Sequence, residues 1–220
     1  MRLIFLGPPG AGKGTQSLLL LQRHGVISLA SGDILREAIR GNEPIGKEAD
    51  RFMKAGQLVP DDLITGLMLD RLGKLAKNQS FVLDGFPRTK DQALALDAWL
   101  IEHRHKPVDL IIDFEMDEDK ILKRLEGRRI CRTCGASYHM KNLVPKKPGQ
   151  CDHCGELLQV RPDDQPETIR RRFVVYHRQT EPLLEFYGSQ KKVRPVPGDL
   201  EIEAQYQALV EVLKKERLVA

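Results

Sequence analysis

Long apolar stretches are missing from this sequence. At the N-terminus only four consecutive apolar residues, Leu3 to Leu6, precede a glycine-rich loop, which is too short for the core of a signal peptide. No other window approaches the roughly 18 apolar residues that a membrane span requires. Nor is any long apolar stripe left over for a subunit interface. We therefore expect a cytoplasmic protein that does not enter membranes and is a monomer.

An excess of one charge is also missing. The 35 basic and 31 acidic residues are interspersed and give a net charge of only +4. A balance of this kind does not demand a nucleic-acid partner, and anionic small molecules suffice as ligands. Fixed-period repeats and low-complexity tracts are absent as well, and 220 residues are enough for one α/β core with small insertions.

Cysteine is scarce and confined to one stretch. Cys131-x-x-Cys134 and Cys151-x-x-Cys154 are separated by sixteen residues, which is the spacing of paired zinc knuckles. Four thiolates would leave no open coordination position, so this pattern predicts a structural Zn²⁺. Two disulfides are the main alternative, although they are unusual in a reducing compartment. His139 or His153 could also replace one cysteine as a ligand.

Short apolar runs recur along the chain and are separated by longer helical patterns. This alternation is typical of an α/β fold, a parallel five-stranded sheet wrapped by helices. The five predicted strands are Leu3 to Leu6, Val26 to Leu29, Phe81 to Leu83, Leu110 to Phe114 and Val193 to Val196. A helix starting near Pro166 and an amphipathic helix from about Leu200 to Arg217 belong to the same core.

Two segments interrupt this alternation. Between the second and third runs, Asp33 to Arg40 and Pro44 to Ala55 read as two short helices of a small insertion. From Arg129 to Val160 the helical period vanishes, and Gly, Pro, Lys and Cys dominate. That segment is too long for an ordinary connection in a compact domain, so we interpret it as a second insertion and predict that it is a lid.

The glycine-rich loop Gly7-Pro8-Pro9-Gly10-Ala11-Gly12-Lys13-Gly14-Thr15 lies between the first strand and a helix over Gln16 to His24. Glycines at this spacing let backbone N–H groups converge on phosphate oxygens, and Lys13 adds a mobile charge. The loop therefore predicts binding of a nucleoside triphosphate. Gly14 stands where the usual motif has a Ser or Thr that binds magnesium, so magnesium must be held differently.

The third strand ends in a carboxylate that is a candidate for holding magnesium. Asp84 follows Phe81 to Leu83 and, in proteins with such a loop, this position lies beside the phosphates. Arg88 follows it in a turn at the carboxyl end of the strand, where open sheets bind ligands. Its planar guanidinium makes the bidentate phosphate contacts that a lysine cannot make.

Further arginines are placed to reach the same ligands. In the helix from Pro166, only Arg172 of the run Arg170-Arg171-Arg172 lies near the apolar face. Arg124 and Arg128 are one helical turn apart, directly before the second insertion.

Together these residues resemble the adenylate kinase family in its long-lid, metal-carrying form, over the whole length of the chain. The motifs that carry the resemblance are Gly7 to Gln16, Ser31-Gly32-Asp33, Asp84 to Thr89 with Gln92, Gly127-Arg128-Arg129 and Arg161 to Asp164. The resemblance implies Mg²⁺-dependent phosphoryl transfer between ATP and AMP, giving two ADP. It also implies a core formed by residues 1–30, 61–127 and 162–220, an AMP-binding insertion at 31–60 and a zinc-bearing lid at 128–161.

The resemblance assigns site residues one by one. For ATP it implies Gly10, Ala11, Gly12, Lys13, Gly14, Thr15, Arg124, Arg128, Ser137, Tyr138 and the main chain near Leu200. For AMP it implies Ser31, Arg36, Gln57, Leu58, Val59, Gly85, Phe86, Pro87, Arg88, Gln92, Arg161 and Arg172. The groups assigned to catalysis are Lys13, Asp84, Arg88, Arg128, Arg161 and Arg172. Bacterial members usually carry threonine where this chain has Ser31, so a methyl contact in the AMP pocket is lost.

Two other functions are compatible with part of this pattern. A UMP/CMP-type kinase shares the loop and the turn after Asp84, but such kinases usually have short lids, and Gln92 is placed to read an adenine edge. A zinc ribbon that binds nucleic acid on a nucleotide-switch scaffold would need interleaved aromatic residues, and the ribbon has only Tyr138. The long zinc-bearing insertion and Gln92 favour AMP as the acceptor, and the lack of aromatic residues disfavours nucleic-acid binding.

Overall fold

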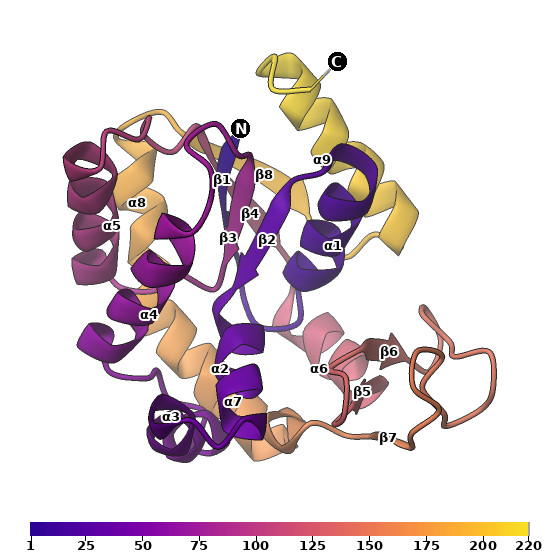
Figure 1. The fold of residues 1–220 in the computed structure, drawn as a ribbon. Coiled ribbons are helices and arrows are strands. Elements are labelled where there is room, and N and C mark those ends of the chain that lie inside the picture. Colours follow the sequence, from indigo (N-terminus) through magenta and orange to yellow (C-terminus); the bar gives the residue numbers. More distant parts are fainter. Residues whose placement is uncertain (220) are drawn as a thin grey trace.

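A computed structural model of the protein describes residues 1–219. Its core is one parallel sheet with the strand order β2-β3-β1-β4-β8, seen in the upper half of Figure 1. The strands are β1 (Arg2–Leu6), β2 (Ile27–Ala30), β3 (Phe81–Asp84), β4 (Leu110–Glu115) and β8 (Val193–Pro197). All five predicted strands and their parallel pairing are confirmed.

Alternating side chains on the strands form two apolar layers. On β1, Ile4 and Leu6 point into one layer, whereas Leu3 and Phe5 point into the other. Helices α4 (Asp61–Gly73), α5 (Lys90–Glu102) and α8 (Pro182–Gly188) supply the first layer, and α1 (Lys13–His24) and α9 (Ile202–Lys215) supply the second. A sheet buried on both faces explains why its strands are continuous apolar runs.

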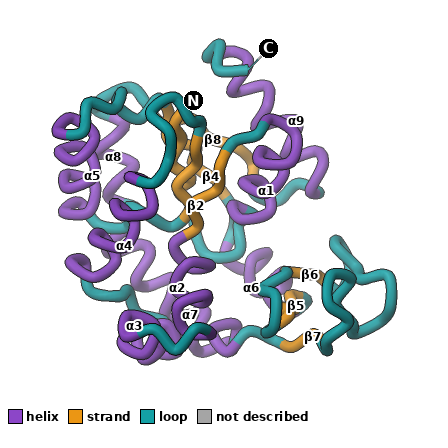
Figure 2. Tube along the Cα trace, in the orientation of Figure 1, coloured by secondary structure: helices purple, strands orange, loops and turns teal. Residues whose placement is uncertain are grey.

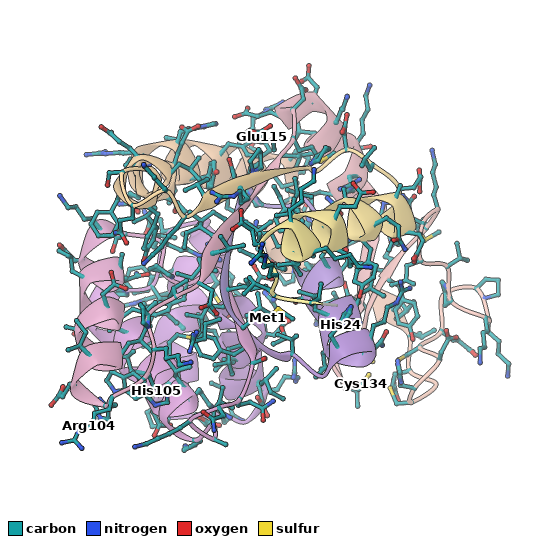
Figure 3. The ribbon with its side chains drawn as sticks, turned by 90° about the horizontal axis from the view of Figure 1, so that it is seen from above. Met1, His24, Arg104, His105, Glu115 and Cys134 are labelled. Carbon is teal, nitrogen blue, oxygen red and sulfur yellow. The ribbon has the colours of Figure 1, made fainter. Side chains whose placement is uncertain are left out.

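Helix α9 closes the second face beside α1. His24, at the end of α1, lies near α9 in the view of Figure 3, and its ring stacks on Tyr206 with centroids 6.4 Å apart. The predicted amphipathic helix is confirmed, since Tyr206, Leu209 and Leu213 are all buried.

The two insertions extend from the carboxyl edge of the sheet. One consists of α2 (Ser31–Arg40) and α3 (Pro44–Ala55), at the bottom of Figure 1. The other follows α6 (Glu118–Glu126) and contains a small antiparallel sheet of β5 (Arg128–Cys131), β6 (Ser137–His139) and β7 (Leu158–Gln159). Figure 2 shows that most of this segment is loop. The chain then returns through the 3₁₀ turn η1 (Pro162–Asp164).

The helix that begins at Pro166 is interrupted in a way that the sequence analysis did not foresee. Helix α7 covers Pro166–Val175, a π-helical turn η2 covers Tyr176–Thr180, and α8 starts at Pro182. Pro182 has no N–H to donate to the preceding turn, and a π turn accommodates such a break. One apolar face nevertheless continues through the π turn and is buried along its length, at Ile169, Phe173, Tyr176, Thr180 and Leu183.

Candidate functional site

A large cleft lies between the carboxyl edge of the sheet and the two insertions. Its volume is about 1180 Å³. The glycine-rich loop, the start of α2, the turn after β3 and the arginines around the second insertion all line it. The cleft is thus placed where open parallel sheets bind ligands, and its size suits two small molecules better than one.

The glycine-rich loop turns sharply into α1. Gly7, Gly10 and Gly12 have positive φ angles of 129°, 96° and 99°. Gly12 also leaves no room for a side chain, because a Cβ there would lie 2.5 Å from Gln205 Oε1. The loop therefore requires glycine for its backbone conformation and for the close approach of α9. Lys13 Nζ donates to the carbonyls of Gly7 and Pro8 at 2.7 and 2.8 Å.

A buried amide on α9 holds this loop in place. Gln205 Nε2 donates to Ala11 O and to Pro197 O, each at 3.1 Å, and its Oε1 accepts from Gln16 Nε2 at 3.0 Å. This residue was not predicted from the sequence. A glutamine on the apolar face of the last helix, between Ile202 and Leu209, is the feature that could have identified it as a buried polar contact. Gln205 links the loop to the segment between β8 and α9, so it positions both together.

Burial lowers the pKa of Lys13 to about 8, although the carboxylate of Asp84 opposes this shift. The folded pKa lies below the unfolded value of 10.5, so protonated Lys13 destabilises the fold, and this cost disappears as the pH rises from 8 to 10.5. We expect the ligand-free protein to gain about 3 kcal/mol across that window from this group. The measurement is denaturant unfolding at several pH values. Lys13→Met should remove the gain, whereas the exposed Lys54→Met should keep it; equal slopes in all three proteins would refute the assignment.

The carboxyl end of β3 faces the loop. Burial raises the pKa of Asp84, and the Lys13 charge opposes this. A Cβ on Gly14 would lie 3.4 Å from Asp84 Oδ2, so the carboxylate lies beside the first turn of α1. Carboxylate oxygen is a ligand that Mg²⁺ prefers, and Asp84 is thus placed to hold it beside the loop.

Arg88 is anchored through one nitrogen only. Its Nε donates to Gly85 O at 2.8 Å, and burial lowers the pKa of its guanidinium. With Nε fixed, the two terminal nitrogens form a fork at the cleft, whose lining includes Arg88. That geometry suits a phosphate.

Three further arginines converge around the return from the second insertion. Arg128 makes a bidentate pair with Asp164, and Arg172 contacts Asp163 Oδ2 at 3.2 Å. Burial lowers the pKa of Arg161 to about 9 and that of Arg172 to about 10. Repulsion from the neighbouring Arg128 lowers both pKa values further. The Nε of Arg161 is buried without a partner among the described residues. Buried arginines this close together repel one another, and an anionic ligand would compensate their charge.

The prediction that Arg172 is the inward member of its run is confirmed. Arg172 lines the cleft, whereas Arg170 and Arg171 are exposed. Asp163 and Asp164 were quoted in the sequence analysis as part of a motif but were given no role. The structure assigns them one, because they pair with Arg128 and Arg172 and hold both guanidinium groups at the cleft.

The opposite wall is built from the first insertion and the turn after β3. Ser31 Oγ donates to Gly85 O at 2.7 Å, and Arg36 pairs with Asp33 at 2.6 Å. Gln92 Oε1 accepts from the backbone N–H of Arg88 at 2.7 Å. The loop 57–59 also lines this wall.

Arg124 connects the second insertion to the loop before α9. Its guanidinium donates to Gly198 O at 2.8 Å and to Leu200 O at 3.2 Å. His139 Nε2 lies 2.9 Å from Arg124 O, and its Nδ1 accepts from the backbone N–H groups of Lys141 and Asn142. Both ring nitrogens of His139 are thus occupied, which excludes it as a metal ligand. Gly127 must remain glycine, since a Cβ there would lie 2.6 Å from the His139 ring.

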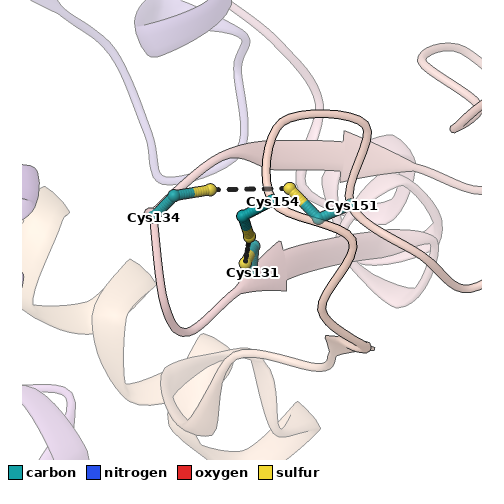
Figure 4. Close-up of side chains that lie close together, drawn as sticks. All are labelled: Cys131, Cys134, Cys151 and Cys154. Carbon is teal, nitrogen blue, oxygen red and sulfur yellow. Dashed lines mark hydrogen bonds between the residues drawn. The ribbon is translucent and has the colours of Figure 1, made fainter.

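The four cysteines meet at one point, as Figure 4 shows. Their sulfur atoms all lie within 4.8 Å of one another, with Cys131 and Cys154 at 3.3 Å and Cys134 and Cys151 at 3.5 Å. Four Zn–S bonds of about 2.3 Å in a tetrahedron place sulfurs roughly 3.8 Å apart, so the cluster fits Zn²⁺. The sulfurs are not bonded in pairs, and all four are free thiols. Tyr138 Oη lies 3.6 Å from Cys151 Sγ, so its side chain supports this cluster.

The structure brings nearly all predicted site residues to one cleft. Of the residues predicted to bind nucleotide, Ala11 and Phe86 do not line it, because their side chains are buried in the core. Only their main chains are available to a ligand. Of the predicted metal ligands, Cys134 lines it, whereas Cys131, Cys151 and Cys154 do not. Asp61, which contacts Gln92, was missed by the sequence analysis. No helix within residues 1–219 has the length and apolarity needed to cross a bilayer.

Comparison with known proteins agrees with this geometry. The family profile described as adenylate kinase matches residues 5–192. An adenylate kinase of Moorella thermoacetica is 44% identical over 216 residues, which cover 98% of this chain and 99% of that protein. One from Archaeoglobus fulgidus is 42% identical over 98% of this chain and 99% of its own length. One from Caldicellulosiruptor bescii is 45% identical over 92% of this chain and 94% of its own.

Proposed function

Because the chain belongs to the adenylate kinase family and catalyses ATP + AMP = 2 ADP, we propose that its cleft holds the two nucleotides phosphate to phosphate. ATP lies over the glycine-rich loop, and AMP lies against the insertion 31–60. The observation that carries this assignment is the convergence of Lys13, Arg88, Arg128, Arg161 and Arg172 on one cleft from four separate parts of the chain.

On the ATP side, the backbone N–H groups from Gly10 to Thr15 bind the phosphates at the start of α1. Arg124 orients the carbonyls of Gly198 and Leu200, and this segment meets the adenine. Ser137 and Tyr138 cover ATP through the main chain, because the Tyr138 side chain is directed to the cysteines. Asp84 would hold the Mg²⁺ that accompanies ATP and neutralises its phosphate charge.

On the AMP side, Arg36 and Arg88 bind the phosphate. Ser31, the loop 57–59, Gly85 to Pro87 and Gln92 enclose the nucleoside. The hydroxyl of Ser31 is occupied by Gly85 O, so it fixes the wall of the pocket.

Phosphoryl transfer in this cleft needs no general base. The second pKa of a phosphate monoester is about 6, so AMP is already largely a dianion at pH 7. What the reaction requires is alignment of two highly charged substrates and stabilisation of charge on the transferred group. Arg128, Arg161 and Arg172 supply this charge. Arg128 and Arg172 exchange their aspartate partners for phosphate, and phosphate offsets the repulsion that Arg161 experiences from neighbouring arginines.

Segment 128–161 acts as a lid over this chemistry, and 31–60 closes on AMP, while 1–30, 61–127 and 162–220 form the core. An open cleft would let water accept the phosphoryl group, so closure protects ATP from hydrolysis. The four cysteines hold structural Zn²⁺ in the lid. Free thiols arranged for metal support a reducing cytoplasm, and we propose that the enzyme acts there as a monomer.

Incubation with MgADP alone tests acceptor and donor together. We expect ATP and AMP to appear in equal amounts, because the cleft holds one nucleotide at each site. With MgATP, AMP should be phosphorylated at least about tenfold faster than UMP or CMP, as coupled assays would measure. Faster turnover of UMP or CMP would overturn the assignment of the base pocket, and unchanged MgADP would overturn the assignment of both sites.

A further inference from the structure

The side-chain amide of Gln92 is held at both ends by the protein. Its Oε1 accepts from the backbone N–H of Arg88, and its Nε2 donates to Asp61 Oδ1, each at 2.7 Å. The hydrogen-bond partners of a side-chain amide show which end is the oxygen and which is the nitrogen. A backbone N–H can only donate and a carboxylate accepts, so both partners require the same orientation of this amide.

Asp61 is itself fixed in place. Its Oδ2 accepts a hydrogen bond from Thr89 Oγ1 at 2.5 Å. Thr89 caps α5, because the same oxygen accepts from the backbone N–H of Gln92 at 3.2 Å. Hydrogen bonds among the side chains of Asp61, Thr89 and Gln92 and the backbone N–H of Gln92 form a closed ring that joins the start of α4 to the start of α5. Gln92 is 2% exposed, so water does not compete for these bonds.

These bonds leave the amide with one N–H and one oxygen lone pair unused. Gln92 lines the cleft, so this pair of groups is what a nucleobase meets there. The Watson–Crick edge of a 6-aminopurine offers an amino donor beside a ring-nitrogen acceptor and matches the pair. A 6-oxopurine offers a carbonyl beside a ring N–H, so it would place acceptor against acceptor and donor against donor.

We propose that Asp61 is a positioning residue that sets the base preference of the monophosphate site. By holding Gln92 in one orientation, it favours 6-aminopurine over 6-oxopurine monophosphates. This inference rests on the proposed contact between Gln92 and the base of AMP. Asp61 itself touches Gln92 and Thr89, not the substrate.

The test is Asp61→Asn, assayed with AMP and with IMP, which differ at the edge in question. The amide of the variant can donate to a flipped Gln92 Oε1, so one of the two groups that fix the orientation is lost and only the Arg88 N–H still opposes the flip. We expect the ratio of kcat/KM for AMP to that for IMP to fall at least about tenfold, mainly through a higher KM for AMP. The KM for ATP and the melting temperature should stay close to those of the wild type. Asp62→Asn is the matched control, because Asp62 is the exposed next residue of the same helix and carries the same charge.

A double-mutant cycle separates this proposal from the one it rests on. If Asp61 acts through Gln92, then Asp61→Asn should have no further effect on the AMP-to-IMP ratio in the Gln92→Leu background. An unchanged ratio in the single variant Asp61→Asn, or a further loss in that background, would overturn the role of Asp61 alone. An unchanged KM for AMP in Gln92→Leu would overturn the contact with the base, and the role of Asp61 would fall with it.

Discussion

Replacing Arg88 by lysine is expected to lower kcat by about 100-fold or more. Arg88 uses Nε to anchor itself on Gly85 O and keeps a two-nitrogen fork for phosphate. Lysine has one nitrogen, so it cannot keep the anchor on Gly85 O and also present two parallel N–H groups to the phosphate. The measurement is steady-state turnover with saturating AMP and MgATP.

Exposed Arg170 supplies the matched control for Arg88→Lys. Arg170→Lys makes the same chemical change on the outer face of α7, and turnover should stay within about twofold of the wild type. Thermal unfolding of both variants should resemble that of the wild type, because lysine keeps the charge and most of the side-chain volume. Turnover of Arg88→Lys within a few-fold of the wild type would remove Arg88 from the site.

The features that could be predicted from the sequence are those with a local cause. Each core strand is a short apolar run, because both faces of the sheet are buried. The bend of the glycine-rich loop depends on its own glycines, and the paired cysteines carry a spacing that few other sites share. The inward direction of Arg172 followed from helical periodicity alone. In all these cases the residues that decide the structure are close together in the chain.

The features that were missed depend on partners that are far apart in the chain. Gln205 contacts Ala11 across 194 positions, and Asp61 contacts Gln92 across 31. The sequence showed a polar residue in each place but gave no way to choose its partner. The sheet of the lid was missed for a related reason, since β7 has only two residues, and its pairing with β5 depends on the turn around the cysteines.

The contacts of Gln205 belong to a larger set that connects the glycine-rich loop with segment 128–161. Gln205 joins the glycine-rich loop to the segment before α9, and Arg124 joins that segment to the hinge of the lid. His139 then ties the lid strand β6 back to the carbonyl of Arg124. Hydrogen bonds and the short stretches of backbone between them therefore connect the phosphate loop to the proposed lid, along the side of the cleft proposed for ATP. The lid is held at its hinge by these polar contacts and has little apolar core of its own.

Removing the metal from the lid should therefore loosen that segment first. The apolar cluster around the cysteines contains only Cys131, Tyr138 and Cys151 with two partly buried neighbours. Few apolar contacts remain to hold 128–161 together once the thiolates lose their shared ion. After chelation we expect proteolytic cleavage within this segment to accelerate about 100-fold, while the sheet of the core stays folded. Limited proteolysis with mass spectrometry locates the cuts, and metal analysis should give about one zinc per chain before chelation.

Variants of the ligands distinguish a structural metal from a catalytic one. Cys151→Ser should reproduce the effect of chelation, whereas His153→Ala should keep its zinc, since the four cysteines complete the cluster without it. Because the sulfurs leave no open coordination position, turnover of the metal-free protein in the cold should fall but persist. A metal-free sample that is still folded but has no turnover would contradict a purely structural role. Cleavage that begins in the core sheet, or zinc lost from His153→Ala, would contradict the assignment of the site.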